Sequence, residues 1–490
     1  MDTISPLRLA CLWIALLTVL RIATLWTTGL ELSGDEAQYW SWAQELDWGY
    51  FTKPPLIAWT IAATTSLCGD GVACVKLGSP LLHAVTALAL YHLGKQIAGE
   101  KVGLRASVLW ITLPSVSFSS MIVSTDVPLL ACWSVAVLSA RKLIDGPSWR
   151  WVIIGGVALG LGLLAKYAMA YLVVGLALHL VITPEARGKL LSRYGLVVLG
   201  VAGVLLLPNI LWNIANEFAT VGHLKDNANL KAAEMFRPLG VLKFWGEQVG
   251  VLAPIPFAIL IWRLIAWARG GIGEKERFLL LITLPPLIVV TAQAFLSRAN
   301  ANWAVTAFPT AIVLVSWWIV ERGPRWLRWW TVAPHVVLGL ILMLAIALWP
   351  NITPPVGERA LSRASGWQKL SAELRPILVG QAHLPVLMSD RKEMALALYY
   401  LRDQLGSSNA PEGRQPVWMF DWNGVPEHHY ELANRYDASK ADPALLLTNY
   451  ADPGQITNRF QTARHLQTLK IISHGRTRRM EVWIVEGFKG

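Results

Sequence analysis

Residues 7–28 read LRLACLWIALLTVLRIATLWTT, and this apolar run decides the class of protein to which the chain belongs. About 20 mostly apolar residues in a helix are enough to cross the hydrocarbon core of a bilayer. The run has no cleavage site of small residues, so we interpret it as an uncleaved first span. The composition agrees, because 54% of the 490 residues are hydrophobic and 15% are charged. Soluble domains carry about 25% charged residues, so a membrane protein of many spans is expected.

Similar apolar runs recur along the chain and predict about eleven membrane-spanning helices. The expected spans are residues 7–28, 77–97, 103–123, 127–144, 150–165, 168–183, 194–213, 248–268, 277–296, 302–320 and 328–349. A shorter run at residues 56–67 predicts an interfacial or re-entrant helix, because it is too short to cross comfortably.

The net charge of +11 is distributed unevenly between the two ends of these spans. Basic residues concentrate near residues 8, 95–105, 141–150, 187–193, 263–277 and 322–328. The opposite loops carry fewer than half as many, namely Lys53, Lys166, Lys225, Lys231, Arg237, Lys243 and Arg298. Cytoplasmic loops are enriched in lysine and arginine, so the N-terminus is expected in the cytoplasm. Anionic lipid also accounts for the positive charge, and no nucleic-acid partner is expected.

Residues 351–490 have a different character, because their apolar runs shrink to five or six residues. The segments PVLMSD, PVWMF, ALLLTN and MEVWIVEGF predict strands, and RKEMALALYYLRDQL has helical periodicity. The chain is therefore expected to have two domains, a membrane domain over 1–350 and a small soluble α/β domain over 351–490. With an odd number of spans, the second domain lies on the side opposite the N-terminus. Cys68 and Cys74 flank a short loop and could pair if that loop faces an oxidising compartment.

The first outer loop contains the most informative polar residues. Asp35 and Glu36 follow the first span directly, and Lys53 precedes two prolines. Aromatic residues between them, including Tyr50, suit a helix at the headgroup level, and an aromatic belt with solvated charges would look similar. A proline pair stiffens the backbone, so Lys53 would stand at a fixed height near the interface. An ammonium positioned there suits a lipid phosphate.

Further polar residues are predicted on the same face. Asp126 lies between two spans with almost no loop; a carboxylate there is costly unless it is paired, functional or the cap of the next helix. Lys166 could counter this carboxylate or snorkel to the interface. Arg298 suits bidentate phosphate binding or contact with headgroups. His223, Lys225 and Tyr50 are candidate contacts for substrate or metal.

A carboxylate and several cations on one membrane face predict a reaction class. Transfer of a sugar from a lipid phosphate needs cations to hold the phosphate and a carboxylate to activate the acceptor. The chain contains no P-loop, GxGxxG, nucleophile elbow or HExxH motif, which disfavours ATPases, soluble nucleotide-sugar enzymes and proteases. A transporter or flippase of lipid-linked sugars is the main alternative, but it would not need an outer domain. A non-catalytic scaffold would leave the Asp-Glu and Lys-Pro-Pro loop unexplained.

The sequence also resembles a known family. GDEAQYW at 34–40 and YFTKPPLIAW at 50–59 look like the first periplasmic loop of bacterial polyprenyl-phosphate-sugar glycosyltransferases of the GT-C superfamily. These enzymes are related to the protein O-mannosyltransferases of glycosyltransferase family 39 and to the lipid A aminoarabinose transferase. The resemblance extends through residues 124–128, 160–167, 301–303 and 389–392, and so covers nearly the whole chain.

The resemblance implies a polytopic α-helical membrane protein with about 11–13 transmembrane helices, a GT-C fold and a small C-terminal α/β soluble domain. It implies that Asp35, with Glu36 beside it, and Asp126 are catalytic, and that Lys53 binds the donor phosphate. We add Arg298 and Lys166 to the predicted donor-phosphate binders. In the aminoarabinose transferases an acidic residue that helps to hold a metal precedes Lys-Pro-Pro, whereas this chain has Thr52. A divalent metal is therefore left open, and no cofactor is assigned.

The expected function is inverting transfer of a sugar from a polyprenyl-phosphate donor to an envelope acceptor, which could be lipid A, lipopolysaccharide, another glycan or a protein. The chain is expected in the bacterial inner membrane as a multi-pass monomer in contact with membrane lipids. The active site and residues 351–490 would face the periplasm.

Overall fold

A computed structural model describes residues 4–220, 222, 236–349, 362–408, 413–473 and 476–490. The chain divides into two compact units. The first comprises Met1–Thr27 and Lys53–Ala347, and the second comprises Thr28–Thr52 and Leu348–Gly490. Residues 28–52 are predicted to belong to the membrane domain, whereas the structure groups them with the C-terminal residues of the second unit. The reason is that the helix formed by these residues packs on a helix of that unit.

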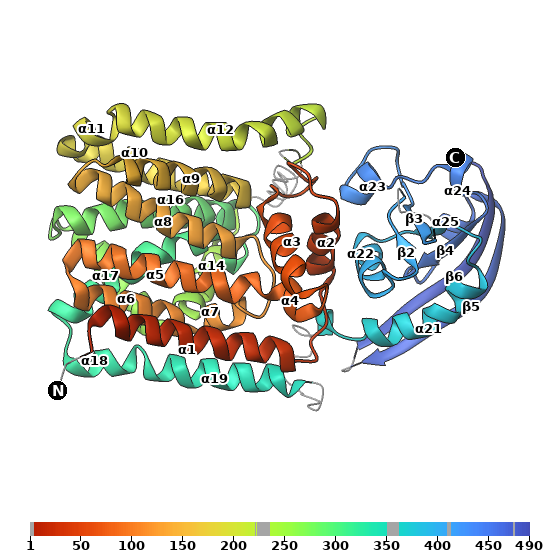
Figure 1. Cartoon of the computed structure of the whole chain (residues 1–490), viewed down its shortest axis with the longest axis horizontal. Coiled ribbons are helices and arrows are strands. Elements are labelled where there is room, and N and C mark those ends of the chain that lie inside the picture. The colour runs from red at the N-terminus through yellow and green to blue at the C-terminus, as the bar shows by residue number, and fades with distance from the viewer. Residues whose placement is uncertain (1–3, 221, 223–235, 350–361, 409–412, 474–475) are drawn as a thin grey trace. The chain divides into compact units, whose positions relative to one another are not determined.

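Over its described residues, the first unit contains helices and no strand. In chain order its α-helices are α1 (Pro6–Thr27), α3 (Leu56–Cys68), α4 (Val72–Lys76), α5 (Gly78–Ala98), α6 (Glu100–Thr112), α7 (Pro114–Ser119), α8 (Asp126–Asp145), α9 (Trp149–Ala165), α10 (Ala170–Ile182), α11 (Pro184–Leu190), α12 (Arg193–Ala215), α14 (Pro238–Leu252), α15 (Pro254–Ala268), α16 (Glu274–Leu296), α17 (Phe308–Glu321), α18 (Arg325–Trp330) and α19 (Ala333–Ala347). Short 3-10 helices η1 (Tyr167–Met169) and η3 (Ala301–Ala307) precede α10 and α17. Figure 1 shows α1, α5, α8, α9 and α12 side by side, and successive members of this row pack together.

The predicted membrane class is confirmed by the lengths of these helices. Among the described residues, seven helices are long and apolar enough to cross a membrane, or eight if the bent pair α14–α15 counts as one span. Helices α3, α9 and the stretch Tyr167–Ile182 are apolar but shorter. The predicted span 103–123 corresponds to α6 and α7, which are separated at Leu113 just before a proline.

The predicted span 248–268 is wrong as a straight helix. Helices α14 and α15 meet at an angle of 118°, and Ala253 between them has a φ of +70°. Pro254 explains the break, because proline lacks the N–H that a helix interior requires and disfavours a helical conformation in the residue before it.

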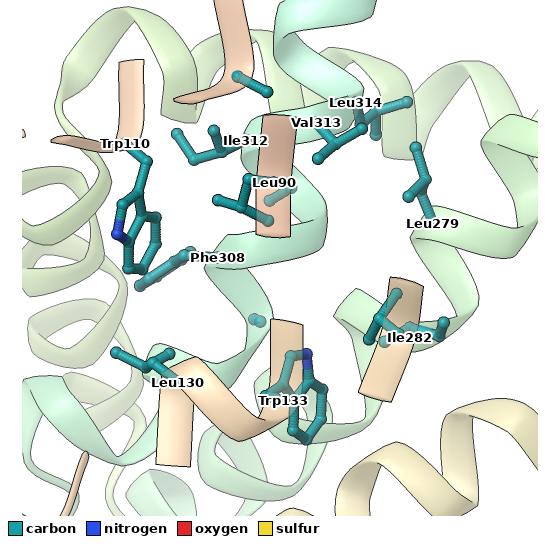
Figure 2. Packing of buried hydrophobic residues seen from close by; sticks show 14 of the residues in the cluster. Leu90, Trp110, Leu130, Trp133, Leu279, Ile282, Phe308, Ile312, Val313 and Leu314 are labelled. Atoms are coloured by element: carbon teal, nitrogen blue, oxygen red, sulfur yellow. The ribbon is translucent and has the colours of Figure 1, made fainter. Parts of the chain in front are cut away.

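The core of the first unit lies among α5, α6, α8, α16 and α17 (Figure 2). Trp133 of α8, Leu90 of α5 and Phe278 of α16 are fully buried there. At the edge of the unit, α9 approaches α12 closely through glycine. A Cβ on Gly156 would lie 2.7 Å from the Cβ of Val201. Small residues allow membrane helices to approach in this way, because packing rather than hydrophobicity drives their association.

Residues that the charge distribution assigned to the cytoplasmic side meet at one end of the first unit. Arg141 at the end of α8 pairs with Glu274 at the start of α16, at 2.9 Å. Lys275 donates to the backbone oxygen of Ile97 at the end of α5, at 2.7 Å. A disulfide joins Cys68, the last residue of α3, to Cys74 within α4.

The second unit joins helix α2 (Gly34–Gln44) to an α/β fold. Its other elements are η5 (Ser362–Ala364), α21 (Trp367–Gly380), β1 (Val386–Met388), α22 (Arg391–Tyr400), β2 (Leu405–Gly406), β3 (Gln415–Met419), α23 (His429–Ala433), α24 (Ala438–Ala441), β4 (Ala444–Thr448), α25 (Gly454–Thr457), β5 (Phe460–Ser473) and β6 (Arg476–Phe488). The strands form one sheet in the order β2-β3-β1-β4-β6-β5. Strands β2, β3, β1 and β4 are parallel, and β6 runs antiparallel to β4 and β5.

The predicted soluble α/β domain is confirmed in its fold class. Val386 lies opposite Val417 on one side and Leu445 on the other, which places β1 at the centre of the parallel part. Strand β5 was not predicted. Most of its residues are exposed, because it is the edge strand, and its sequence lacks the apolar run of a buried strand.

Candidate functional site

Asp126 is the centre of a polar cluster in the first unit. Its side chain is buried at the start of α8. Lys166, the residue that follows α9, places Nζ 2.7 Å from Oδ1 of Asp126. Asn302 in η3 donates through Nδ2 to Oδ2 at 2.6 Å, and the Ser124 hydroxyl donates to the same oxygen at 3.3 Å. The carboxylate therefore bonds to side chains from three segments. Asp126 is not the N-cap of α8, because Thr125 occupies that position.

A second polar group adjoins this cluster along the chain. Tyr167 follows Lys166, and its hydroxyl donates to Oδ1 of Asn209 at 2.8 Å. Asn213, one turn further along α12, donates to the same hydroxyl at 3.2 Å. Both asparagines are buried in an otherwise apolar helix. Polar groups inside a membrane helix are costly, so these contacts indicate that the end of α9 is held in one position.

The Asp126–Lys166 pair leads to a test of stability. Asp126→Asn should destabilise the full chain by roughly 1–3 kcal/mol, because it leaves a mostly buried ammonium without its counter-charge. Asp126→Asn combined with Lys166→Met should recover part of this loss. Thermal unfolding in detergent would measure the coupling in a double-mutant cycle. The exposed pair Lys243–Glu247, at 3.9 Å on α14, is the control and should couple by no more than about 0.5 kcal/mol. Additive effects at Asp126 and Lys166 would contradict the paired arrangement.

In the second unit, Asp35 lies in the first turn of α2. Ser33 begins the helix: its hydroxyl accepts from the Glu36 backbone N at 3.4 Å, and the Glu36 carboxylate accepts from the Ser33 backbone N at 2.8 Å. This reciprocal arrangement is a capping box, which explains why the helix starts here. Glu36 is buried by these contacts, while the Asp35 side chain is 55% exposed. The catalytic role predicted for Glu36 stays a prediction, and its contacts are those of a helix cap.

The Asp35 carboxylate is paired with Arg391 of α22. Nη2 of Arg391 lies 3.0 Å from Oδ1 of Asp35, and Nη1 of the same guanidinium donates to Oε1 of Gln38. Both acceptors lie on one face of α2, three residues apart. The predicted catalytic carboxylate is thus accessible and held in a defined contact.

Tyr50 is part of the core beneath α2. Its hydroxyl donates to the Trp42 backbone oxygen at 2.9 Å, and its ring stacks on Trp42 at 4.5 Å. The ring of His429 meets both aromatics edge-on, at 5.4 and 5.5 Å. Burial raises the pKa of Tyr50 and lowers the pKa of His429 to about 3. Tyr50, predicted as a substrate or metal contact, is placed by the structure as a packing residue, and its predicted contact stays a prediction.

The neutral His429 predicts loss of stability in acid. Between its folded pKa of about 3 and an unfolded value of about 6.5, the unfolded chain binds a proton that the folded chain does not. The contribution of His429 to the free energy of unfolding is therefore fully present above that window. It falls as the pH falls, and about 2 kcal/mol of it is lost at pH 5. His428, whose pKa is lowered to about 4 mainly by burial, adds to the effect.

Unfolding of the full chain at pH 7.5 and pH 5 would measure this loss. His429→Phe keeps a ring against Trp42 and should reduce the acid sensitivity. The exposed His383 of the same unit is the control, and His383→Gln should leave the sensitivity unchanged. Equal acid sensitivity in wild type and His429→Phe would contradict the assignment.

Two further predicted site residues, Lys53 and Arg298, belong to the first unit. Lys53 is half-buried at the start of the second segment of the first unit, immediately before the two prolines that precede α3. Arg298 is exposed between α16 and η3, four residues before Asn302. His223 and Lys225 lie outside the described residues. Among the residues that are described, no three His, Cys, Asp or Glu side chains come together as metal ligands.

Sequence reasoning assigned no role to three polar residues, of which Asn302 and Arg391 belong to these clusters and Arg21 lies elsewhere in the first unit. Asn302 was noted in a motif without a role, and Arg391 without a partner. Arg21 of α1 is fully buried and donates to the Ser117 hydroxyl at 3.0 Å. An arginine inside an apolar run is costly, and this signal could have been used. No local pattern relates Asn302 to Asp126 or Arg391 to Asp35, which lie 176 and 356 residues apart.

Comparisons with known proteins agree on one class. Residues 52–212 match the family model described as dolichyl-phosphate-mannose-protein mannosyltransferase. The chain is 33% identical over 436 residues to the lipid A galacturonosyltransferase RgtD of Rhizobium johnstonii, covering 89% of each chain. It is 25% identical over 502 residues to the undecaprenyl phosphate-alpha-4-amino-4-deoxy-L-arabinose arabinosyl transferase of Serratia proteamaculans, covering 89% of this chain and 88% of that one.

The fold is similar to that of a solved membrane protein. The crystal structure of ArnT from Cupriavidus metallidurans matches with a TM-score of 0.66 and 14% identity, covering 96% of this chain and 97% of that one. The same protein has been solved bound to undecaprenyl phosphate, with the same TM-score. At this identity the likeness supports the fold.

Proposed function

Since this chain belongs to the family of membrane glycosyltransferases that includes the lipid A galacturonosyltransferase RgtD, we propose that it transfers an acidic sugar from a polyprenyl phosphate to the lipid A part of lipopolysaccharide. The observation that carries the proposal is the 33% identity with that enzyme over 89% of both chains. The name of the arabinosyl transferase contains an undecaprenyl phosphate sugar, and the name of the galacturonosyltransferase contains lipid A. The proposed donor is taken from the first and the proposed acceptor from the second.

The proposed chemistry uses the Asp35 carboxylate and the side-chain cations of Lys53 and Arg298. The donor phosphate binds Lys53 and Arg298, whose charges stabilise the phosphate as it leaves. Lys166 is a weaker candidate for this role, because its ammonium already pairs with Asp126. An acceptor oxygen attacks the anomeric carbon with inversion, the bond from that carbon to the phosphate oxygen breaks, and polyprenyl phosphate leaves. Asp35 takes the proton of a hydroxyl acceptor; an acceptor phosphate is already ionised, and Asp35 then positions it.

The residue before Lys-Pro-Pro supports an acidic sugar. The aminoarabinose transferases, which the sequence also resembles, carry an acidic residue at this position and use a donor with an amino group. Thr52 is neutral. A carboxylate beside the donor site would repel a uronic acid, because like charges in a partly desolvated site interact strongly. Thr52 removes this repulsion.

A purified-enzyme assay tests the function. The full chain in detergent, supplied with synthetic polyprenyl-phosphate galacturonic acid and lipid A, should form a glycosylated lipid A and free polyprenyl phosphate in equal amounts, as measured by mass spectrometry. The same donor carrying aminoarabinose should react more slowly. A transporter of lipid-linked sugars would form neither product. Absence of transfer with both donors, from protein that is folded, would overturn the proposal.

The proposal places the site on the periplasmic side. The charge distribution puts Asp126, Lys166 and Arg298 opposite the cytoplasmic loops. The disulfide between Cys68 and Cys74 suits an oxidising compartment, such as the periplasm.

Labelling of engineered cysteines tests this orientation. Val425→Cys, at a position that is 64% exposed in the second unit, should react with a membrane-impermeant maleimide in intact spheroplasts. Lys101→Cys, at an exposed position predicted to be cytoplasmic, should react only after permeabilisation. The reverse pattern would invert the topology and move the proposed site to the cytoplasm.

A further inference from the structure

Helix α2, which carries Asp35, is held by the C-terminal part of the second unit at both of its ends. Before the helix, the Leu32 backbone N donates to the Tyr400 hydroxyl at 2.8 Å. The Glu31 carboxylate accepts from the backbone N of Trp367 at 2.5 Å, at the start of α21. After the helix, the Ser407 hydroxyl donates to the Glu45 carboxylate at 2.7 Å. The position of α2 therefore depends on residues more than 300 positions away in the chain.

Arg391 acts on the Asp35 side chain itself. Its two terminal nitrogens bond to Asp35 and to Gln38. Residues three apart on a helix face the same side, and a guanidinium presents its donors as a rigid fork. One arginine can thus bridge both side chains and restrict the rotation of the Asp35 carboxylate. A lysine has a single ammonium and cannot reproduce this fork.

The backbone of α2 also lies unusually close to α22. A Cβ on Gly34 would be 2.6 Å from the Cβ of Lys392 and 3.2 Å from its Cα. A side chain at position 34 would therefore push the two helices apart. Glycine at this position permits the approach that brings Arg391 to Asp35.

Stability alone is a poor explanation for the Arg391–Asp35 pair. The two side chains are 26% and 55% exposed, and exposed ion pairs contribute about 0–1 kcal/mol. The hydrogen bonds at Leu32, Glu31 and Glu45 already attach α2 to the rest of the unit. What the pair adds is a fixed direction for one accessible carboxylate.

We propose that Arg391 is a positioning residue for glycosyl transfer, which orients the Asp35 carboxylate toward the acceptor through its bridge to Asp35 and Gln38. This inference rests on the proposed role of Asp35. It also gives the C-terminal part of the second unit a function in catalysis, because that part supplies the guanidinium that orients a carboxylate of α2.

The test compares kcat and KM in the full-length enzyme. Arg391→Gln should lower kcat roughly 10–100-fold, since small misplacements of a reacting group have effects of this size. KM for the polyprenyl-phosphate donor should stay within about twofold, because the donor phosphate binds elsewhere. Arg391→Lys should restore only part of kcat. Gly34→Ala, which changes no charge, should also lower kcat. In an Asp35→Asn background, Arg391→Gln should cause no further loss.

The matched control is Arg375→Gln. Arg375 belongs to the same unit and forms an exposed pair with Asp403, and its loss should leave kcat within about twofold. Hydrogen exchange of the α2 amides gives a readout independent of turnover, and exchange should rise in Arg391→Gln but not in Arg375→Gln.

Three outcomes would overturn the inference, and they are distinguishable. Wild-type kcat in Arg391→Gln, together with an inactive Asp35→Asn, would refute positioning by Arg391 and leave the proposed function intact. Full activity in Asp35→Asn would refute both. An equal loss of kcat in Arg391→Gln and Arg375→Gln would indicate a general structural effect and would also refute the inference.

Discussion

Asp35→Asn is expected to lower turnover by roughly 10²–10⁴-fold, the usual range for groups that act in acid–base catalysis. The substitution keeps the size of the side chain and removes the charge. Asp35 is the accessible carboxylate of the first turn of α2, while its neighbour Glu36 is buried in the capping box. A neutral amide can neither take a proton from an acceptor hydroxyl nor orient it as a carboxylate does.

The fold should survive this substitution, which makes turnover interpretable. The capping box of α2 does not involve the Asp35 side chain, and an exposed ion pair contributes little to stability. Asp403→Asn removes an acid of the same unit that also pairs with an arginine, and it should leave turnover unchanged. Transfer to lipid A by purified variants would be measured against their thermal unfolding. Near-normal turnover in folded Asp35→Asn would reject the assignment.

Lys53→Gln is expected to lower kcat/KM by an amount that corresponds to a loss of about 2–4 kcal/mol in transition-state stabilisation, as for the loss of a group that stabilises a developing anion. Lys53 is half-buried and immediately precedes Pro54 and Pro55, so its backbone is restricted. If its ammonium holds the donor phosphate, the charge is needed most as polyprenyl phosphate leaves. Lys53→Arg should rescue only partly, because a planar fork differs in shape from a compact ammonium.

A snorkelling lysine would behave differently. Lys53→Gln would then change little, and Lys53→Arg would change nothing. Lys243 provides the control, because it is a lysine of the same predicted face whose side chain is 77% exposed, and Lys243→Gln should keep wild-type efficiency. Transfer from a synthetic polyprenyl-phosphate sugar decides between the two cases. Wild-type efficiency in Lys53→Gln would mean that the phosphate is held elsewhere.

The sequence predicts the class and much of the organisation because these depend on local patterns. Apolar runs such as residues 7–28 and 194–213 correspond to α1 and α12 within a few residues. In the same way, the predicted short apolar segments correspond to the strands β1, β3, β4 and β6. Local patterns fail where the chain bends or lies at an edge. The bend at Ala253 and the exposed strand β5 were both missed, although Pro254 gave a signal for the first.

The candidate residues could be identified from the sequence for a similar reason. A carboxylate or a cation in an apolar environment is costly wherever it lies, so Asp126, Lys166 and the Asp35–Lys53 loop are conspicuous in the sequence alone. Their roles were harder to infer. Glu36 stands next to Asp35 in the sequence, yet it caps the helix while Asp35 is exposed. The direction of each side chain on α2 separates the two, and the helix start had to be known first.

Hydropathy and periodicity act over a few turns of chain, so the amino-acid sequence alone predicts a membrane protein with a soluble α/β unit. Which polar groups meet depends on the tertiary structure. Asp126 pairs with Lys166 across 40 residues and with Asn302 across 176, and Asp35 pairs with Arg391 across 356. Such contacts arise when whole helices pack, and packing depends on the surfaces of several segments at once. The partner of a charge is therefore a property of the folded chain, while the need for a partner is already present in the sequence.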